Sequence, residues 1–204
     1  MTKVVVLDYG SGNVRSVVRM LERIGADVDL SADPDAVRNA DGLYVPGVGN
    51  FHACMAGLNA VDGGALIGAR LAAGRPVLGV CVGYQVLFDG SVEPARAQLP
   101  GLGLWPGTVA RLTADVVPHM GWSEVTAAAG SRLLDGLDGE RFYFVHSYAP
   151  PRWRGASDAV VSTATHGDPF VAAVEAGVLA GTQFHPEKSG DAGAQLLRNW
   201  CDSL

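Results

Sequence analysis

Four short segments of apolar, β-branched residues constrain the fold of this chain more than any other feature. They are residues 3–8, 27–30, 42–45 and 76–80, and the first three are each followed by a helical or loop pattern of suitable length. Strands buried on both faces show continuous apolar runs, and parallel strands need crossover connections between them. The first half of the chain therefore predicts an α/β fold, a doubly wound and mostly parallel sheet flanked by helices.

The pattern changes after residue 100, where several strand-like segments follow one another with short turns and little helix. These segments are residues 102–112, 116–125, 141–150, 158–165 and 169–177. They predict an added, largely antiparallel sheet layer. Helical spacing of apolar residues returns in 190–204, which predicts a final helix. With no repeat and no linker, residues 1–204 are expected to form a single domain.

Composition and charge exclude several classes of function. Fifteen Lys and Arg against 21 Asp and Glu give a formal net charge of −6, a poor match for nucleic acid. The opening segment turns polar at Asp8, too early for a signal peptide, and no apolar run is long enough to span a bilayer. Three cysteines cannot all pair within the chain. We expect a soluble, cytoplasmic protein with free thiols that binds no membrane.

Cys81 is the strongest candidate for a catalytic residue. In VLGVCVGYQVLF it follows an apolar strand, with Gly79 and Gly83 two residues to either side, and an amphipathic helix is expected to begin after it. This arrangement predicts a nucleophile elbow with sulfur in place of oxygen, where the start of a helix favours a thiolate. For Cys81 alone, a buried structural cysteine is the alternative. Cys54 and Cys201 lack such a setting and are predicted to be structural.

His185 and Glu187, in GTQFHPEKSG, are the candidates for the base and the group that orients it. Residues two apart in an extended segment point the same way, and Pro186 favours extended geometry at the residue before it. One imidazole nitrogen can then face Cys81 while the other donates to the carboxylate. A surface turn with an incidental contact is the alternative for this pair alone. His146 is predicted to be a structural strand histidine, and the spacings typical of zinc sites are absent, so no metal and no cofactor are expected.

The glycine loop PGVGN, residues 46–50, follows the predicted strand 42–45. Ligand crevices in open α/β sheets lie at the carboxyl ends of the strands. The backbone N–H groups of Val48 and Gly49, with that of Val82 just past the nucleophile, are therefore predicted to form an oxyanion hole. An ordinary glycine-rich turn is the alternative.

PGVG, GVCVGYQ and QFHPEKS, in this order and spacing, resemble the motifs of the class I (triad) glutamine amidotransferases. The segments at 8–17, 117–122, 143–148 and 185–189 narrow the resemblance to the glutaminase subunits of imidazole glycerol phosphate synthase, over nearly the whole chain. The resemblance implies hydrolysis of glutamine to glutamate and ammonia by a Cys-His-Glu triad. It also implies a heterodimer with a cyclase subunit, which uses the ammonia to make imidazole glycerol phosphate and AICAR in histidine biosynthesis.

The resemblance further implies substrate and partner residues. Glutamine would be held by Gly47, Gln85, Glu93 at its amino group, and Ser147 and Tyr148 at its carboxylate. Asn13, His119, Met120, Trp122, Tyr143 and Lys188 would face the cyclase. The PGVG loop would adopt its oxyanion-binding form only when the cyclase carries its substrate.

The chain departs from the commoner family pattern at Val82 and Tyr84, where Leu and Met are frequent, and at 115–116, where a Lys is common. None of these changes touches a reacting atom. Three alternatives are a glutaminase of another pathway, such as pyridoxal phosphate or aromatic amino acid synthesis, a catalytically silent binding subunit, and an α/β-hydrolase. The segments 117–122 and 143–148 argue against the first, the intact triad against the second, and the short spacing from His185 to Glu187 against the third.

Overall fold

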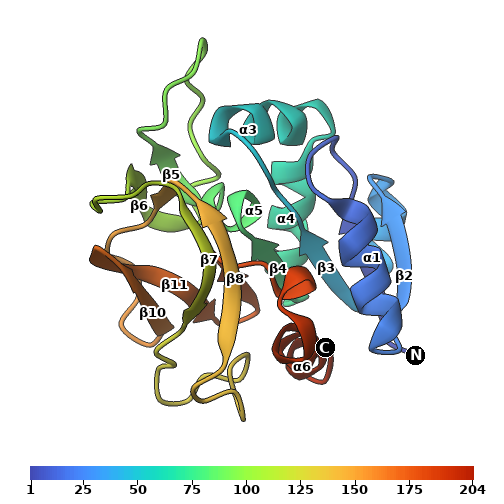
Figure 1. Ribbon diagram of the computed structural model, residues 1–204. Coiled ribbons are helices and arrows are strands. Elements are labelled where there is room, and N and C mark those ends of the chain that lie inside the picture. Colours follow the sequence, from blue (N-terminus) through green and yellow to red (C-terminus); the bar gives the residue numbers. More distant parts are fainter.

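A seven-stranded sheet forms the centre of the computed structural model, which describes all 204 residues (Figure 1). Its strands, in spatial order, are β10 (Val160–His166), β11 (Asp168–Ala176), β12 (Leu179–Thr182), β4 (Val77–Val80), β3 (Gly42–Val45), β1 (Lys3–Leu7) and β2 (Asp27–Ser31). The five strands from β12 to β2 are parallel, and β10 and β11 pair antiparallel. The predicted α/β fold with a mostly parallel sheet is confirmed. No residue of β3, β4 or β12 is exposed, as continuous apolar runs require.

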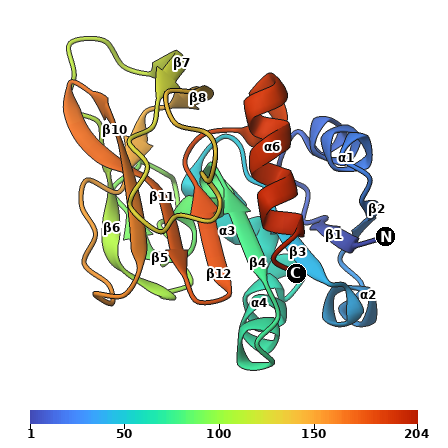
Figure 2. The ribbon, with the colours of Figure 1, turned by 90° about the horizontal axis from the view of Figure 1, so that it is seen from below.

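Helices cover both faces of this sheet (Figure 2). One face carries α1 (Val14–Arg23) and α6 (Gly190–Cys201), and the other carries α2 (Pro34–Asn39) and α4 (Gly63–Ala72), against which α3 (Phe51–Ala60) packs. In α1 the buried residues are Val17, Met20 and Leu21, whose spacing forms one apolar stripe. The predicted final helix is confirmed as α6.

Two small sheets lie beside the central one. They are β5 (Phe88–Ser91), β6 (Trp105–Arg111) and β9 (Tyr148–Ala149), and the hairpin of β7 (His119–Glu124) with β8 (Arg141–His146). The predicted, largely antiparallel layer is confirmed by these sheets, although two of its expected strands, β10 and β11, extend the central sheet instead. Alternating polarity identifies a half-buried strand but does not say which sheet edge it joins.

A single cluster of 51 buried apolar residues extends through the molecule from Val4 to Trp200. Next to it, the fully buried Arg70 guanidinium joins α4 to the segments around it. It donates hydrogen bonds of 2.7–3.0 Å to the backbone carbonyls of Val37, Ala40, Asp41 and Pro76. A buried charge is tolerated where such partners replace water. None of the helices is both long and apolar enough to cross a membrane.

Candidate functional site

The order of the strands brings the predicted motifs together. Neighbours β12, β4 and β3 are parallel, so their carboxyl ends meet at one edge of the sheet. His185 lies three residues after β12, Cys81 directly after β4, and the loop 46–49 directly after β3. The nucleophile strand lies between the other two. Cys81 therefore has the base on one side and the glycine loop on the other, as the ligand crevice of an open α/β sheet requires.

Cys81 occupies a strained turn between β4 and α5 (Val82–Gln85). Its backbone has φ 56° and ψ −114°, a region that residues other than glycine rarely adopt. Gly83 has no room for a side chain, because an added Cβ would overlap the Val45 carbonyl. The predicted elbow is present, but α5 is a single turn rather than the expected amphipathic helix. A turn this short cannot offer a negative charge the dipole of a long helix.

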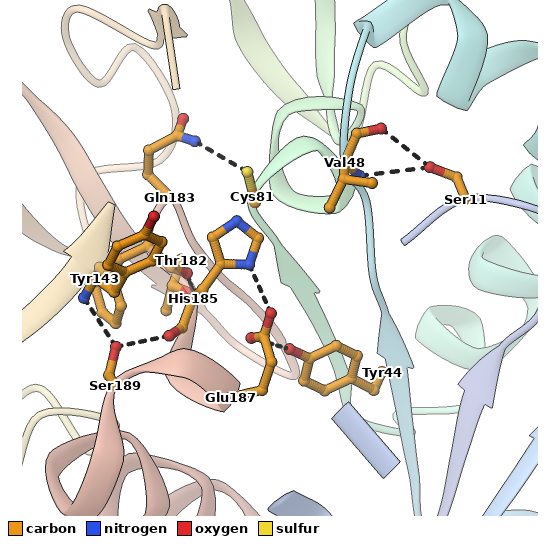
Figure 3. A network of polar contacts seen from close by, with 11 residues as sticks. Ser11, Tyr44, Val48, Cys81, Tyr143, Thr182, Gln183, His185, Glu187 and Ser189 are labelled. Atoms are coloured by element: carbon orange, nitrogen blue, oxygen red, sulfur yellow. Dashed lines mark hydrogen bonds and ion pairs between the residues drawn. The ribbon is translucent and has the colours of Figure 1, made fainter. Parts of the chain in front are cut away.

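His185 and Glu187 form a buried pair. The imidazole Nδ1–H donates to Glu187 Oε1 over 2.7 Å, and both side chains are only 2% exposed. The expectation of a continuous extended segment is wrong in one detail. His185 is extended, but Pro186–Lys188 form a 3-10 turn, η1, which brings the carboxylate back beneath the ring. The other ring nitrogen, Nε2, is buried without a hydrogen-bond partner and points toward Cys81 (Figure 3).

The charge state of this pair follows from its neighbours. Burial disfavours the imidazolium, but a negative Cys81 sulfur and the Glu187 carboxylate outweigh burial and raise the pKa of His185 from 6.5 to about 10. His185 can therefore carry a proton at neutral pH while it faces the sulfur. A thiolate beside an imidazolium is the activated state of a cysteine nucleophile.

Three supporting residues were not predicted from the sequence. Tyr44, in β3, donates from its hydroxyl to Glu187 Oε2 over 3.2 Å. Ser189 Oγ donates to the His185 carbonyl over 2.6 Å, which ties the start of α6 to the base. Gln183 Nε2 lies 3.9 Å from the Cys81 sulfur. Gln183 and Ser189 had a local signal, because both lie in the QFHPEKS segment that contains His185. Tyr44 is a hydroxyl in a buried strand, and no pattern connects it to Glu187.

A cavity of about 210 Å³ opens over the sulfur. It is lined by Cys81, His185, Val48, Gly49, Val82, Gln85, Glu93, Pro118, Val145, His146, Ser147 and Tyr148. This volume is smaller than the roughly 300–1,000 Å³ typical of pockets for drug-sized ligands, and it fits a smaller metabolite. Most of the predicted substrate residues thus gather here, although Gly47 lies outside the lining. The side-chain amide of Gln85 is already engaged, donating to the Tyr148 carbonyl over 2.7 Å and to Gln183 Oε1 over 3.0 Å.

The predicted oxyanion hole is not assembled in this arrangement. The Val48 N–H donates to Ser11 Oγ over 3.4 Å (Figure 3). The Val82 N–H donates to the Gly47 carbonyl over 3.3 Å. Two of the three expected donors therefore make bonds within the protein. Both bonds involve the peptide between Gly47 and Val48, which directs its carbonyl toward the elbow and its N–H away from it.

The residues expected to face a partner are mostly on the surface. Met120 and Trp122 are 68% and 53% exposed, Asn13 is exposed, and Lys188 Nζ lies 5.9 Å from the centre of the Tyr143 ring. The expectation for His119 is wrong for its side chain, which is only 3% exposed.

His119 is buried because β7 turns it toward the aromatic interior. Its ring stacks on His166 and Phe144 at centroid distances of 4.3 and 4.6 Å, and Nδ1 lies 3.2 Å from His146 Nε2. Burial, and secondarily the charge of His166, lowers the pKa of His119 to about 4. His146 is buried as predicted, and burial lowers its pKa to about 3. No group of three or more His, Cys, Asp or Glu side chains is placed to hold a metal ion.

Known proteins match this chain along its whole length. The model of the glutamine amidotransferase class-I family matches residues 5–204. The chain is 63% identical over 202 residues to imidazole glycerol phosphate synthase subunit HisH of Mycobacterium tuberculosis (strain CDC 1551 / Oshkosh), covering 98% of each protein. It is 58% identical over 211 residues to the protein of that name from Corynebacterium diphtheriae, covering all of both. A crystal structure of a glutamine amidotransferase superimposes with a TM-score of 0.76 over 97% of each chain at 20% identity, which supports the fold.

Proposed function

The chain belongs to the class I glutamine amidotransferase family, and we propose that it is the glutaminase subunit of imidazole glycerol phosphate synthase in histidine biosynthesis. It hydrolyses glutamine to glutamate and ammonia and supplies the ammonia to a cyclase subunit. One observation carries the chemistry: a buried imidazole between a strained cysteine and a carboxylate, at the base of a cavity sized for an amino acid. The functional unit is the single domain 1–204, because one core extends through it.

The first half-reaction makes a thioester. The Cys81 thiolate attacks the side-chain amide carbon of glutamine, and the carbonyl electrons move to the oxygen. As this tetrahedral intermediate collapses, His185 Nε2–H donates its proton to the nitrogen, the C–N bond breaks, and ammonia leaves. Glu187 holds the ring in the tautomer and orientation that this transfer needs, through the 2.7 Å bond to Nδ1.

The second half-reaction releases glutamate. His185 Nε2, now neutral, takes a proton from water, and the hydroxyl attacks the thioester carbon. The C–S bond breaks, which restores the Cys81 thiolate beside the imidazolium. Within the cavity, the Glu93 carboxylate accepts a hydrogen bond from the amino group of glutamine, and Ser147 and Tyr148 hold the carboxylate of glutamine.

Catalysis needs the Gly47–Val48 peptide to turn. In the arrangement described, its carbonyl accepts the Val82 N–H. Rotation of this one peptide would free that donor and direct the Val48 N–H toward the developing oxyanion, and such donors contribute about 10²–10³ each in rate. The isolated subunit is therefore expected to have little activity, and substrate bound to the cyclase favours the turned form.

The partner face is the region around Met120, Trp122, Tyr143, Lys188 and Asn13. Two large apolar side chains exposed side by side on β7, beside a lysine over an aromatic ring, fit the aromatic-rich centre of a protein interface. Docking here forms a heterodimer with the cyclase. Ammonia would otherwise be protonated in bulk water, so the partner's active site must receive it directly.

The test is glutamate release by wild type, Cys81→Ala and the matched control Cys201→Ala, each alone and with the cyclase and its substrate. We expect release in the stimulated complexes of wild type and Cys201→Ala, and none from Cys81→Ala. Release that is insensitive to the cyclase would reject the pathway and leave the triad intact. Equal release by Cys81→Ala and wild type would reject the mechanism.

A further inference from the structure

His52, at the start of α3, contacts the loop that carries Glu93. Residues 92–98 after β5 are exposed apart from Glu93, so this loop has few apolar contacts of its own to hold it in place. The His52 side chain is only 4% exposed and lies beneath the loop. His52 belongs neither to the triad nor to the predicted substrate contacts.

Both ring nitrogens of His52 are satisfied by the loop backbone. The Leu99 N–H donates to Nδ1 over 2.9 Å, which makes Nδ1 an acceptor and places the ring proton on Nε2. Nε2–H then donates to the Glu93 carbonyl over 2.9 Å. One planar ring thus holds the two ends of the exposed segment at a set separation.

The neighbouring residues of α3 complete the attachment. The Phe51 N–H donates to Glu93 Oε2 over 2.7 Å, and Asn50 Nδ2 donates to the Pro94 carbonyl over 3.1 Å. With Oε2 used in this way, Oε1 is the oxygen left without a protein partner, and Glu93 lines the cavity over Cys81. The direction of Oε1 therefore depends on the position of the Glu93 backbone, which His52 sets.

We propose that His52 is a positioning residue that sets the selectivity of this enzyme for the α-amino group of its substrate. It acts through Glu93 and does not touch the substrate. This inference rests on the proposed function, in which Glu93 receives that amino group. An imidazole suits the task because it combines one donor and one acceptor on opposite edges of a rigid ring.

The experiment compares glutamine with 4-carbamoylbutanoate, which has the same amide and carboxylate but no amino group. Glutamate or glutarate is quantified by chromatography, in the full complex with the cyclase and its substrate. The readout is the ratio of kcat/KM for the two substrates. A fraction of misfolded enzyme lowers both values equally and leaves the ratio unchanged, so the ratio isolates positioning from stability.

Four variants give the answer. Glu93→Gln should lower the ratio by about 10- to 100-fold, the value of a hydrogen bond to a charged group. His52→Ala should lower it by about tenfold, and His52→Gln, which keeps a donor and an acceptor, should retain most of it. Asn199→Ala is the matched control: this side chain also holds a loop, through the Leu133 and Asp135 carbonyls, but outside the cavity. Its ratio should equal that of wild type.

A wild-type ratio in His52→Ala together with a lowered ratio in Glu93→Gln would overturn the role of His52 and leave the proposed function standing. A wild-type ratio in both variants would overturn the role of His52 together with the assignment of Glu93 to the amino group. A ratio that is lowered in Asn199→Ala as well would also overturn the inference, because fixing a loop anywhere in the protein would then have the same effect.

Discussion

Replacing Tyr44 with phenylalanine removes one hydroxyl from the support of the catalytic base. That hydroxyl donates to Glu187 Oε2 over 3.2 Å, and Tyr44 is fully buried. Burial and the neighbouring carboxylate raise the pKa of Tyr44 well above 10, so the group is a donor throughout the working range of pH. In Tyr44→Phe, one oxygen of a buried carboxylate loses its partner, and the ring that Glu187 orients loses part of its restraint.

The magnitude follows from the charge of the acceptor. A hydrogen bond to a charged group is worth about 1.5–3 kcal/mol. Because about 1.4 kcal/mol corresponds to a factor of ten in rate, loss of this bond in the transition state would lower kcat by roughly 10- to 100-fold. KM for glutamine should change little, since Tyr44 does not line the cavity. The assay is glutamate release by the stimulated complex over a range of glutamine concentrations.

Tyr84→Phe provides the control. Tyr84 is equally buried, and its hydroxyl donates to the Val171 carbonyl over 3.3 Å. This hydroxyl makes no hydrogen bond to His185 or Glu187. Its loss should cost about 1 kcal/mol of stability, the value of a neutral hydrogen bond, and leave kcat nearly unchanged. If Tyr44→Phe lowers kcat no more than Tyr84→Phe does, the role of Tyr44 in orienting Glu187 is refuted.

Four further outcomes are expected. In Cys81→Ala, NMR titration should find the pKa of His185 below its wild-type value of about 10, because the negative sulfur is gone. An unchanged pKa would exclude an ion pair between Cys81 and His185. The stability contributed by the raised pKa is fully present below pH 6.5 and is lost as pH rises through about 10. Urea unfolding should therefore show the advantage of wild type over His185→Gln shrinking between these values. Ser11→Ala should raise glutaminase activity of the isolated subunit by about 2- to 10-fold, because it frees the Val48 N–H, and unchanged activity would contradict this role. Arg70→Leu should lower the free energy of unfolding by more than about 3 kcal/mol in urea titrations, against under about 1 kcal/mol for the exposed Arg75→Leu, and equal losses would refute the role of Arg70.

The sequence by itself determined the parallel strands, the elbow at Cys81 and the identity of the triad. Each of these depends on neighbours along the chain. A continuous apolar run identifies a buried strand, glycines two residues to either side of Cys81 mark a strained turn, and a single proline separates His185 from Glu187. The resemblance to a family then joined these local features into one site.

Only the tertiary structure decided which strands are neighbours and which groups therefore meet. The order β12-β4-β3 places Cys81 between His185 and the glycine loop, and it brings Tyr44 to Glu187. The tertiary structure also decided that β10 and β11 extend the central sheet and that His119 is buried. It decided as well that the Gly47–Val48 peptide directs its carbonyl, and not its N–H, toward the elbow. Strand pairing and hydrogen bonds between distant segments depend on positions in space, and one apolar run or one hydroxyl is compatible with many partners until the chain has folded.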